Sequence, residues 1–220
     1  MIVRQERLSY AKRTRLINAA IEEFAERGVD SASYNKIIER SGLSKGTVYY
    51  YFDNKDSLLM TVLDEICDQF HQAIGDIKLP ETREEFWDTV REYDGRAIRF
   101  FLGNPRLWRV LHWISKDLPL KEQFKVIRER ITYFIDNLTA KGLEIGAVRN
   151  DIPLETAQRL RHEMGKVLAY EMLGDFEAWS KGKCEKELLD VEKFIAAMHD
   201  LGKRILTPRE DWVCTHFCRN

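Results

Sequence analysis

The chain of 220 residues has only four cysteines and no apolar run of the roughly 18 residues that a membrane span requires. Cysteines this few and this scattered do not form the disulfide framework of small secreted proteins. The N-terminal segment also lacks the apolar core of a signal peptide. We therefore expect a cytoplasmic protein with free thiols and no membrane segment.

Sequence motifs of common enzymes are absent as well. No phosphate-binding GxGxxG or GxxxxGK[ST] motif occurs. The segment at His162 begins like the zinc motif HExxH, but Lys166 stands at the second ligand position and would repel a metal ion. Cys214, His216 and Cys218 offer three soft ligands without an obvious fourth, so we interpret residues 209–220 as a tail, with a metal sensor as the alternative. We predict no catalytic residues, no metal site and no cofactor.

The overall charge gives little sign of a polyanionic partner. The net charge is -1 and the isoelectric point is about 6.5. Residues 1–55 nevertheless carry a net charge of +3, which leaves -4 for the rest of the chain. Any binding of nucleic acid must therefore come from the N-terminal part.

Hydrophobic periodicity indicates helices along nearly the whole chain and no convincing strand, so we predict an all-α fold. A first helix is expected at 9–27, ended by Gly28 in a left-handed conformation. A second is expected at 34–41, with Ser33 as its N-cap and Gly42 after its last residue.

The stretch SGLSKGTVYYYF at 41–52 predicts a third, short helix. Ser44 can cap it by accepting a hydrogen bond from the Thr47 amide. One face then buries Val48, Tyr51 and Phe52, and the opposite face carries Gly46, Thr47, Tyr49 and Tyr50 beside Lys45. Two short helices joined by a glycine-containing turn are typical of the helix-turn-helix, whose outer face suits phosphate oxygens and base edges. Packing of Tyr49 and Tyr50 against a neighbouring helix is the alternative.

The run from Arg15 to Leu59 resembles the N-terminal domain of the tetracycline-repressor (TetR) family of bacterial transcription regulators. The resemblance includes an alanine pair before a phenylalanine in the first helix, the pattern Ser-Lys-Gly-Thr-x-Tyr-x-Tyr-Phe, and the Lys and Leu that follow. It implies a three-helix DNA-binding domain at 1–55 and a larger helical effector-binding and dimerisation domain at 56–208.

The resemblance also implies roles for individual residues. The expected base contacts are Asn35, Lys45, Gly46 and Tyr49, and the expected phosphate contacts are Ser33, Tyr34, Thr47, Tyr50 and Lys55. A fourth helix, capped by Asp53 or Asn54, would connect the two domains. Residues 141–153 would form the loop before the last two long helices, expected at 153–173 and 185–206, through which two subunits would form a homodimer.

The second domain would bind a small effector. The side chains predicted to contact it combine apolar bulk with polar or aromatic tips and are Tyr93, Phe101, Trp108, His112, Tyr133, His162 and Tyr170. Aromatic residues at helical spacing are also typical of an ordinary core, which is the alternative for this set.

The sequence therefore predicts a dimeric, ligand-responsive DNA-binding regulator and not an enzyme. The expected activity is repression at a near-palindromic double-stranded DNA operator, relieved by a largely apolar or aromatic effector. The alternative is a helical ligand-binding protein or enzyme that keeps the fold without sequence-specific DNA binding. Intact Lys45, Gly46, Thr47 and Tyr49 favour the regulator.

Overall fold

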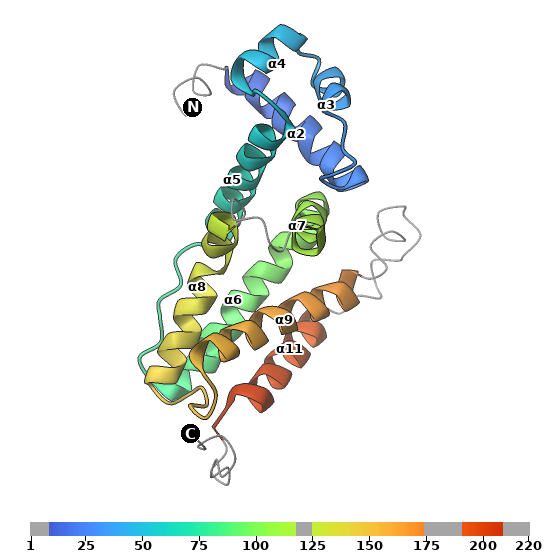
Figure 1. Ribbon diagram of the computed structural model, residues 1–220. Coiled ribbons are helices and arrows are strands. Elements are labelled where there is room, and N and C mark those ends of the chain that lie inside the picture. The colour runs from blue at the N-terminus through green and yellow to red at the C-terminus, as the bar shows by residue number, and fades with distance from the viewer. Residues whose placement is uncertain (1–8, 118–124, 174–190, 209–220) are drawn as a thin grey trace, which may run out of the picture. The chain divides into compact units, whose positions relative to one another are not determined.

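The computed structural model describes residues 9–117, 125–173 and 191–208 of the protein. Every secondary-structure element in these ranges is a helix (Figure 1), which confirms the all-α prediction. The N-terminal helices are α2 (Tyr10–Arg27), α3 (Tyr34–Ser41), α4 (Lys45–Tyr51) and α5 (Lys55–Ile74). They are followed by α6 (Arg83–Gly103), α7 (Pro105–Asp117), α8 (Lys125–Glu144), α9 (Leu154–Leu173) and α11 (Val191–Leu206).

The chain divides into two compact units. Unit 1 lies within Met1–Ala73 and Phe100–Ile131, and unit 2 lies within Ile74–Arg99 and Thr132–Asn220. Unit 1 therefore combines the N-terminal helices with α7 and the beginning of α8. The functional division at residue 55 remains a prediction, because it rests on the expected roles of the segments and not on their packing.

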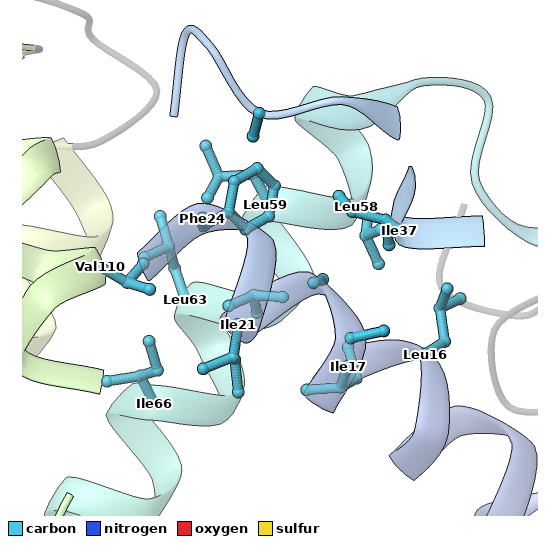
Figure 2. Close-up of a cluster of buried hydrophobic side chains, with 14 of the residues drawn as sticks. Leu16, Ile17, Ile21, Phe24, Ile37, Leu58, Leu59, Leu63, Ile66 and Val110 are labelled. Carbon is cyan, nitrogen blue, oxygen red and sulfur yellow. The ribbon is translucent and has the colours of Figure 1, made fainter. Parts of the chain in front are cut away.

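The core of unit 1 joins α2, α3 and α5 to α7. Figure 2 shows Phe24 of α2, Leu59 and Leu63 of α5 and Val110 of α7 gathered in one cluster, with exposed fractions between 0% and 1%. Apolar side chains at spacings of three and four residues along α2 and α5 supply this shared face. Burial of four such side chains contributes on the order of 6–12 kcal/mol of transfer free energy.

The helix ends follow local rules with one departure. Gly28 has the positive φ expected after α2, at 78°, but its ψ of 164° is extended and not that of a left-handed helix. A Cβ at this position would lie 3.3 Å from Cδ2 of Trp113, so the close approach of α7 also favours glycine. Asn54, and not Asp53, caps α5, because its Oδ1 accepts a hydrogen bond from the Ser57 amide at 2.8 Å.

Unit 2 contains the side-by-side pair α9 and α11 (Figure 1). The predicted loop at 141–153 was wrong at its start, because α8 continues to Glu144. The helix ends where Gly146 takes a φ of 70° and the amides of Ala147 and Val148 both donate to the carbonyl of Gly142. The expected beginning of the last helix at 185–190 lies outside the described residues.

Candidate nucleic-acid interface

Side-chain caps fix the ends of the two short helices. The Ser33 hydroxyl accepts a hydrogen bond from the Lys36 amide at 3.4 Å, and the Ser44 hydroxyl accepts one from the Thr47 amide at 3.1 Å. Between them Gly42 takes a left-handed conformation, φ 64° and ψ 21°, and its amide donates to Glu39. The predicted caps and turn are thus confirmed, and they set where α4 begins.

Helix α4 presents two chemically different faces. Val48 is fully buried and Phe52, which follows the helix, is 2% exposed, whereas Tyr49 and Tyr50 are 47% and 51% exposed. Gly46 is also exposed, and a Cβ added to it would meet no described atom within 4 Å. The outer face therefore carries hydroxyls and rings on a backbone that a ligand can approach closely, as the sequence predicted.

The two exposed tyrosines each pack edge-on against another ring. Tyr49 lies 5.3 Å from Tyr34, with ring planes at 86°, and Tyr50 lies 4.9 Å from Tyr51, at 89°. Such T-shaped pairs are favourable and restrict the rotamers of the exposed rings. The hydroxyl groups of α4 are consequently held on a partly ordered surface before any ligand binds.

The hydroxyl hydrogen of Tyr34 is used within the protein. Its hydroxyl donates a hydrogen bond to the carbonyl of Phe52 at 2.8 Å. Burial raises the pKa of Tyr34 to about 12, with further contributions from Tyr49 and Asp53. Because a phenol has one proton, Tyr34 cannot donate to a phosphate while this bond stands.

Lys55 is similarly engaged within the fold. Its Nζ donates to the carbonyls of Val29, Asp30 and Ala32 at 2.7, 2.9 and 3.0 Å. An ammonium group has three hydrogens, and these three acceptors use all of them. The structure thus gives Lys55 and Tyr34 internal partners that the predicted phosphate contacts did not include.

Other predicted contact residues still have polar groups that can bond to a ligand outside the domain. Ser33 uses only an acceptor position in its cap, so its own hydroxyl hydrogen is still available. Thr47 and Ser44 share a hydrogen between their hydroxyls at 2.8 Å. Lys45 and Asn35 are exposed. The first turns of α3 and α4 therefore expose hydroxyl, amide and ammonium groups together.

The predicted effector residues fall into both units. In unit 2, Tyr93 is 7% exposed and stacks on Phe134 at 5.1 Å, and burial raises its pKa. His162 of the same unit has Nε2 2.9 Å from Oδ1 of Asp136. Tyr133 is 70% exposed, so its predicted place in the lining of a pocket has no support in the single chain. The side chain of Tyr170 lies outside the described residues.

The remaining three predicted effector residues belong to unit 1. Phe101 and Trp108 are in edge contact at 5.4 Å, and Phe101 also stacks on Phe70 at 5.4 Å. His112 is partly buried and its ring lies 5.9 Å from that of Trp113. The described contacts therefore bring Phe101 and Trp108 together in unit 1.

Three buried charges were missed by the sequence analysis. Glu23 is 1% exposed in unit 1, and Asp94 and Arg161 are each 6% exposed in unit 2. Asp94 lies four residues after Val90, within the apolar stripe of α6, and Arg161 lies four residues after the buried Ala157. A charged residue at a core-facing position is the signal that would have identified both.

Two predicted absences concern the described part of the chain only. Among the described residues no group of three His, Cys, Asp or Glu side chains is placed to hold a metal ion. Cys214, His216 and Cys218 lie outside those residues. No described helix is long and apolar enough to cross a membrane.

Known proteins resemble this chain both in its N-terminal helices and over most of its length. The profile described as "Bacterial regulatory proteins, tetR family" matches residues 16–62. The Fatty acid metabolism regulator protein of Bacillus subtilis is 26% identical over 161 residues, 72% of this chain and 80% of that protein. The HTH-type transcriptional repressor AcnR of Corynebacterium glutamicum is 23% identical over 146 residues, 65% of this chain and 72% of the relative. A crystal structure of a TetR family transcriptional regulator from Chloroflexus aurantiacus superposes with a TM-score of 0.70, at 26% identity, over 93% of this chain and 97% of that one.

Proposed function

We propose, from the premise that this chain is a DNA-binding transcriptional regulator of the TetR family and not an enzyme, that it represses transcription from a near-palindromic operator. In this proposal the protein binds as a homodimer, and a small, largely apolar or aromatic effector releases it. The observation that carries the proposal is the outer face of α4, where exposed Lys45, Gly46, Tyr49 and Tyr50 lie beside the cap of Ser44.

The proposed division of contacts follows the exposure of each group. Lys45, Gly46 and Tyr49 of α4, together with Asn35 of α3, would read base edges in the major groove. Ser33 and Thr47 would hold phosphates through hydroxyl groups near the helix N-termini, whose partial positive charge favours anions, and Tyr50 would hold one through its exposed phenol on the last turn of α4. Lys45 adds a full positive charge to this surface.

The proposed dimer uses α9 and α11. Leu160 on α9 and Leu201 on α11 are 37% and 40% exposed in the single chain, although each helix buries other apolar residues. Exposed leucines on paired helices support a contact with the same helices of a second subunit. Two recognition helices would then meet half-sites about one helical turn apart or somewhat more.

The proposed effector response is allosteric. Effector binding in the second domain would favour a domain arrangement whose recognition helices no longer match the half-site spacing, with α5 carrying the shift. A hundredfold loss of operator affinity requires about 2.7 kcal/mol of coupling free energy. A relative named for fatty acid metabolism and the aromatic side chains of unit 2, such as Tyr93 and Phe134, both support an apolar effector.

The test is selection of bound fragments from random or genomic DNA, followed by affinity measurements at several salt concentrations. The proposal expects a near-palindromic site bound far more tightly than random DNA, with a steep dependence of affinity on salt. No enrichment would refute operator binding. Effectors that bind tightly yet leave operator affinity unchanged would refute the release mechanism.

A further inference from the structure

Three hydrogen-bonding groups act on the short stretch that leads from α2 into α3. Lys55, at the beginning of α5, donates to the carbonyls of Val29, Asp30 and Ala32. Glu23 of α2 accepts a hydrogen bond from the Ser33 amide at 3.1 Å. The Tyr34 hydroxyl, in the first residue of α3, donates to the carbonyl of Phe52. We call Glu23, Tyr34 and Lys55 the turn anchor.

The turn anchor holds this stretch from both sides. Positive charge on Lys55 faces carbonyl oxygens that follow the C-terminus of α2, where the helix dipole also favours a cation. The carboxylate of Glu23, 1% exposed, takes up the amide of the residue that caps α3. The carbonyls and the amide in the same few residues are thereby satisfied without solvent.

The turn anchor also ties α3 to the end of α4. The bond from Tyr34 to Phe52 spans the two helices, and the Tyr34 ring packs edge-on against Tyr49. The exposed groups of Ser33, Asn35 and Tyr49 therefore take their positions from backbone segments that the anchor fixes. A shift of about 1 Å in such groups is enough to break hydrogen bonds to a rigid ligand.

We infer that Lys55 is a positioning residue for DNA recognition and not a phosphate contact. Its ammonium sets the geometry of the α2–α3 turn, and through Ser33 and Tyr34 it sets the spacing of the groups on α3 and α4 that meet DNA. The inference rests on the DNA-binding function proposed above. It replaces the role that the sequence predicted for Lys55 by one that its three carbonyl partners require.

The substitution Lys55→Arg separates the two roles. Arginine keeps the positive charge and binds phosphate at least as well as lysine. Its planar guanidinium cannot direct three hydrogens from one nitrogen to three converging carbonyls, because no guanidinium nitrogen carries three. A phosphate-contact role therefore expects operator affinity near that of wild type, whereas a positioning role expects affinity to fall about tenfold, the equivalent of one or two lost hydrogen bonds.

The experiment measures the affinity of the full-length protein for its selected operator and for random DNA. The control is Lys78→Arg, the same substitution at an exposed lysine in the segment that connects α5 to α6. If Lys55 is a positioning residue, Lys55→Arg should weaken operator binding about tenfold and change the affinity for random DNA little. The measurements are made at a temperature where circular dichroism shows that every variant is folded. Operator affinity within about twofold of wild type would overturn the inference.

Charge removal gives the second measurement. The slope of log affinity against log salt concentration is negative, and each lost phosphate contact reduces its magnitude by about 0.9. Lys55→Met is expected to keep the wild-type slope, whereas loss of a phosphate contact at Lys55 would reduce the magnitude of the slope by about that amount. A slope of smaller magnitude for Lys55→Met would overturn the positioning role.

Hydrogen exchange in the DNA-free protein tests the anchor independently of the operator. Amide exchange at Ala32 and Ser33 is expected to be faster in Lys55→Arg than in wild type and unchanged in Lys78→Arg. Unchanged exchange at both amides would overturn the inference. Failure of the wild-type protein to select any DNA site would instead refute the proposed function, and the exchange result would still decide whether the anchor exists.

Discussion

Arg161 of α9 donates a hydrogen bond to the carboxylate of Asp94 of α6, and their side chains are only 6% and 7% exposed. Burial raises the pKa of the Asp94 carboxyl, and the neighbouring Arg161 opposes that shift. Such a pair adds little net stability compared with apolar residues, but removal of one partner leaves a buried charge without compensation. Any arrangement of α6 and α9 that separates these two side chains within the core is therefore penalised.

We predict that Arg161→Met lowers the free energy of unfolding by about 3–5 kcal/mol at neutral pH. Without Arg161 the folded-state pKa of Asp94 rises further, so the folded protein binds a proton that the unfolded chain does not. The stability of this variant should accordingly fall as pH rises above the ordinary pKa of an aspartate and level off above the raised folded-state pKa. Urea unfolding at several pH values measures both effects, and a loss below about 1 kcal/mol would contradict the buried pair.

The substitution Gly142→Ala should destabilise unit 2. A Cβ at Gly142 would lie 2.3 Å from Cε2 of Phe86 and 2.7 Å from Cγ2 of Val148, so the packing of α8 has no room for a methyl group. We expect a loss of about 1–3 kcal/mol in thermal or denaturant unfolding. Gly103→Ala is the control, because a Cβ there meets no described atom within 4 Å, and it should be neutral or slightly stabilising.

Substitutions on the two faces of α4 should separate DNA binding from stability. Tyr49→Ala removes a ring that is 47% exposed and should change the preferred operator sequence with little change in melting temperature. Val48→Ala, one residue earlier and fully buried, should instead cost about 2 kcal/mol of stability. Repeated DNA selection and calorimetry on both variants test the assignment. An unchanged sequence preference for Tyr49→Ala would refute its role as a base contact.

The proposed dimer predicts a particular response to charge. Leu160→Glu combined with Leu201→Glu places carboxylates on the exposed apolar positions of α9 and α11 and should convert the dimer to monomers. Light scattering coupled to size exclusion measures the mass. Leu79→Glu, at a leucine that is 42% exposed outside these helices, is the matched control. Equal masses for all variants would place the interface elsewhere.

Cys67 should be chemically inert in the folded protein. It is fully buried in α5, and burial raises the pKa of its thiol to about 11. The thiolate fraction at pH 8 is then on the order of one in a thousand, and access is blocked as well. In a variant with Cys184, Cys214 and Cys218 replaced by serine, a thiol reagent should react only after denaturant is added. Rapid reaction of the native variant would contradict this burial.

Local physical rules were sufficient to predict the caps of α3 and α4 and the side chains that α4 exposes. The caps at Ser33 and Ser44, the left-handed Gly42 and the two faces of α4 each depend on residues no more than about four positions apart. The error at the start of 141–153 came instead from the family resemblance, which placed the beginning of the loop at Lys141, within α8. Glycines such as Gly142 and Gly146 indicate where a helix can end. Helix α8 nevertheless continues to Glu144, and the amides of Ala147 and Val148 then donate to the carbonyl of Gly142.

The sequence by itself determined the helical fold, the helix-turn-helix and the side chains that α4 exposes, because periodicity and capping act between near neighbours. Only the tertiary structure decided which polar groups are already engaged. The partners of Tyr34, Lys55 and Arg161 lie 18, up to 26 and 67 residues away along the chain. Two of these residues bind backbone carbonyls, which every residue type carries. No sequence pattern identifies such an acceptor, and only the folded path of the chain brings it within hydrogen-bond distance.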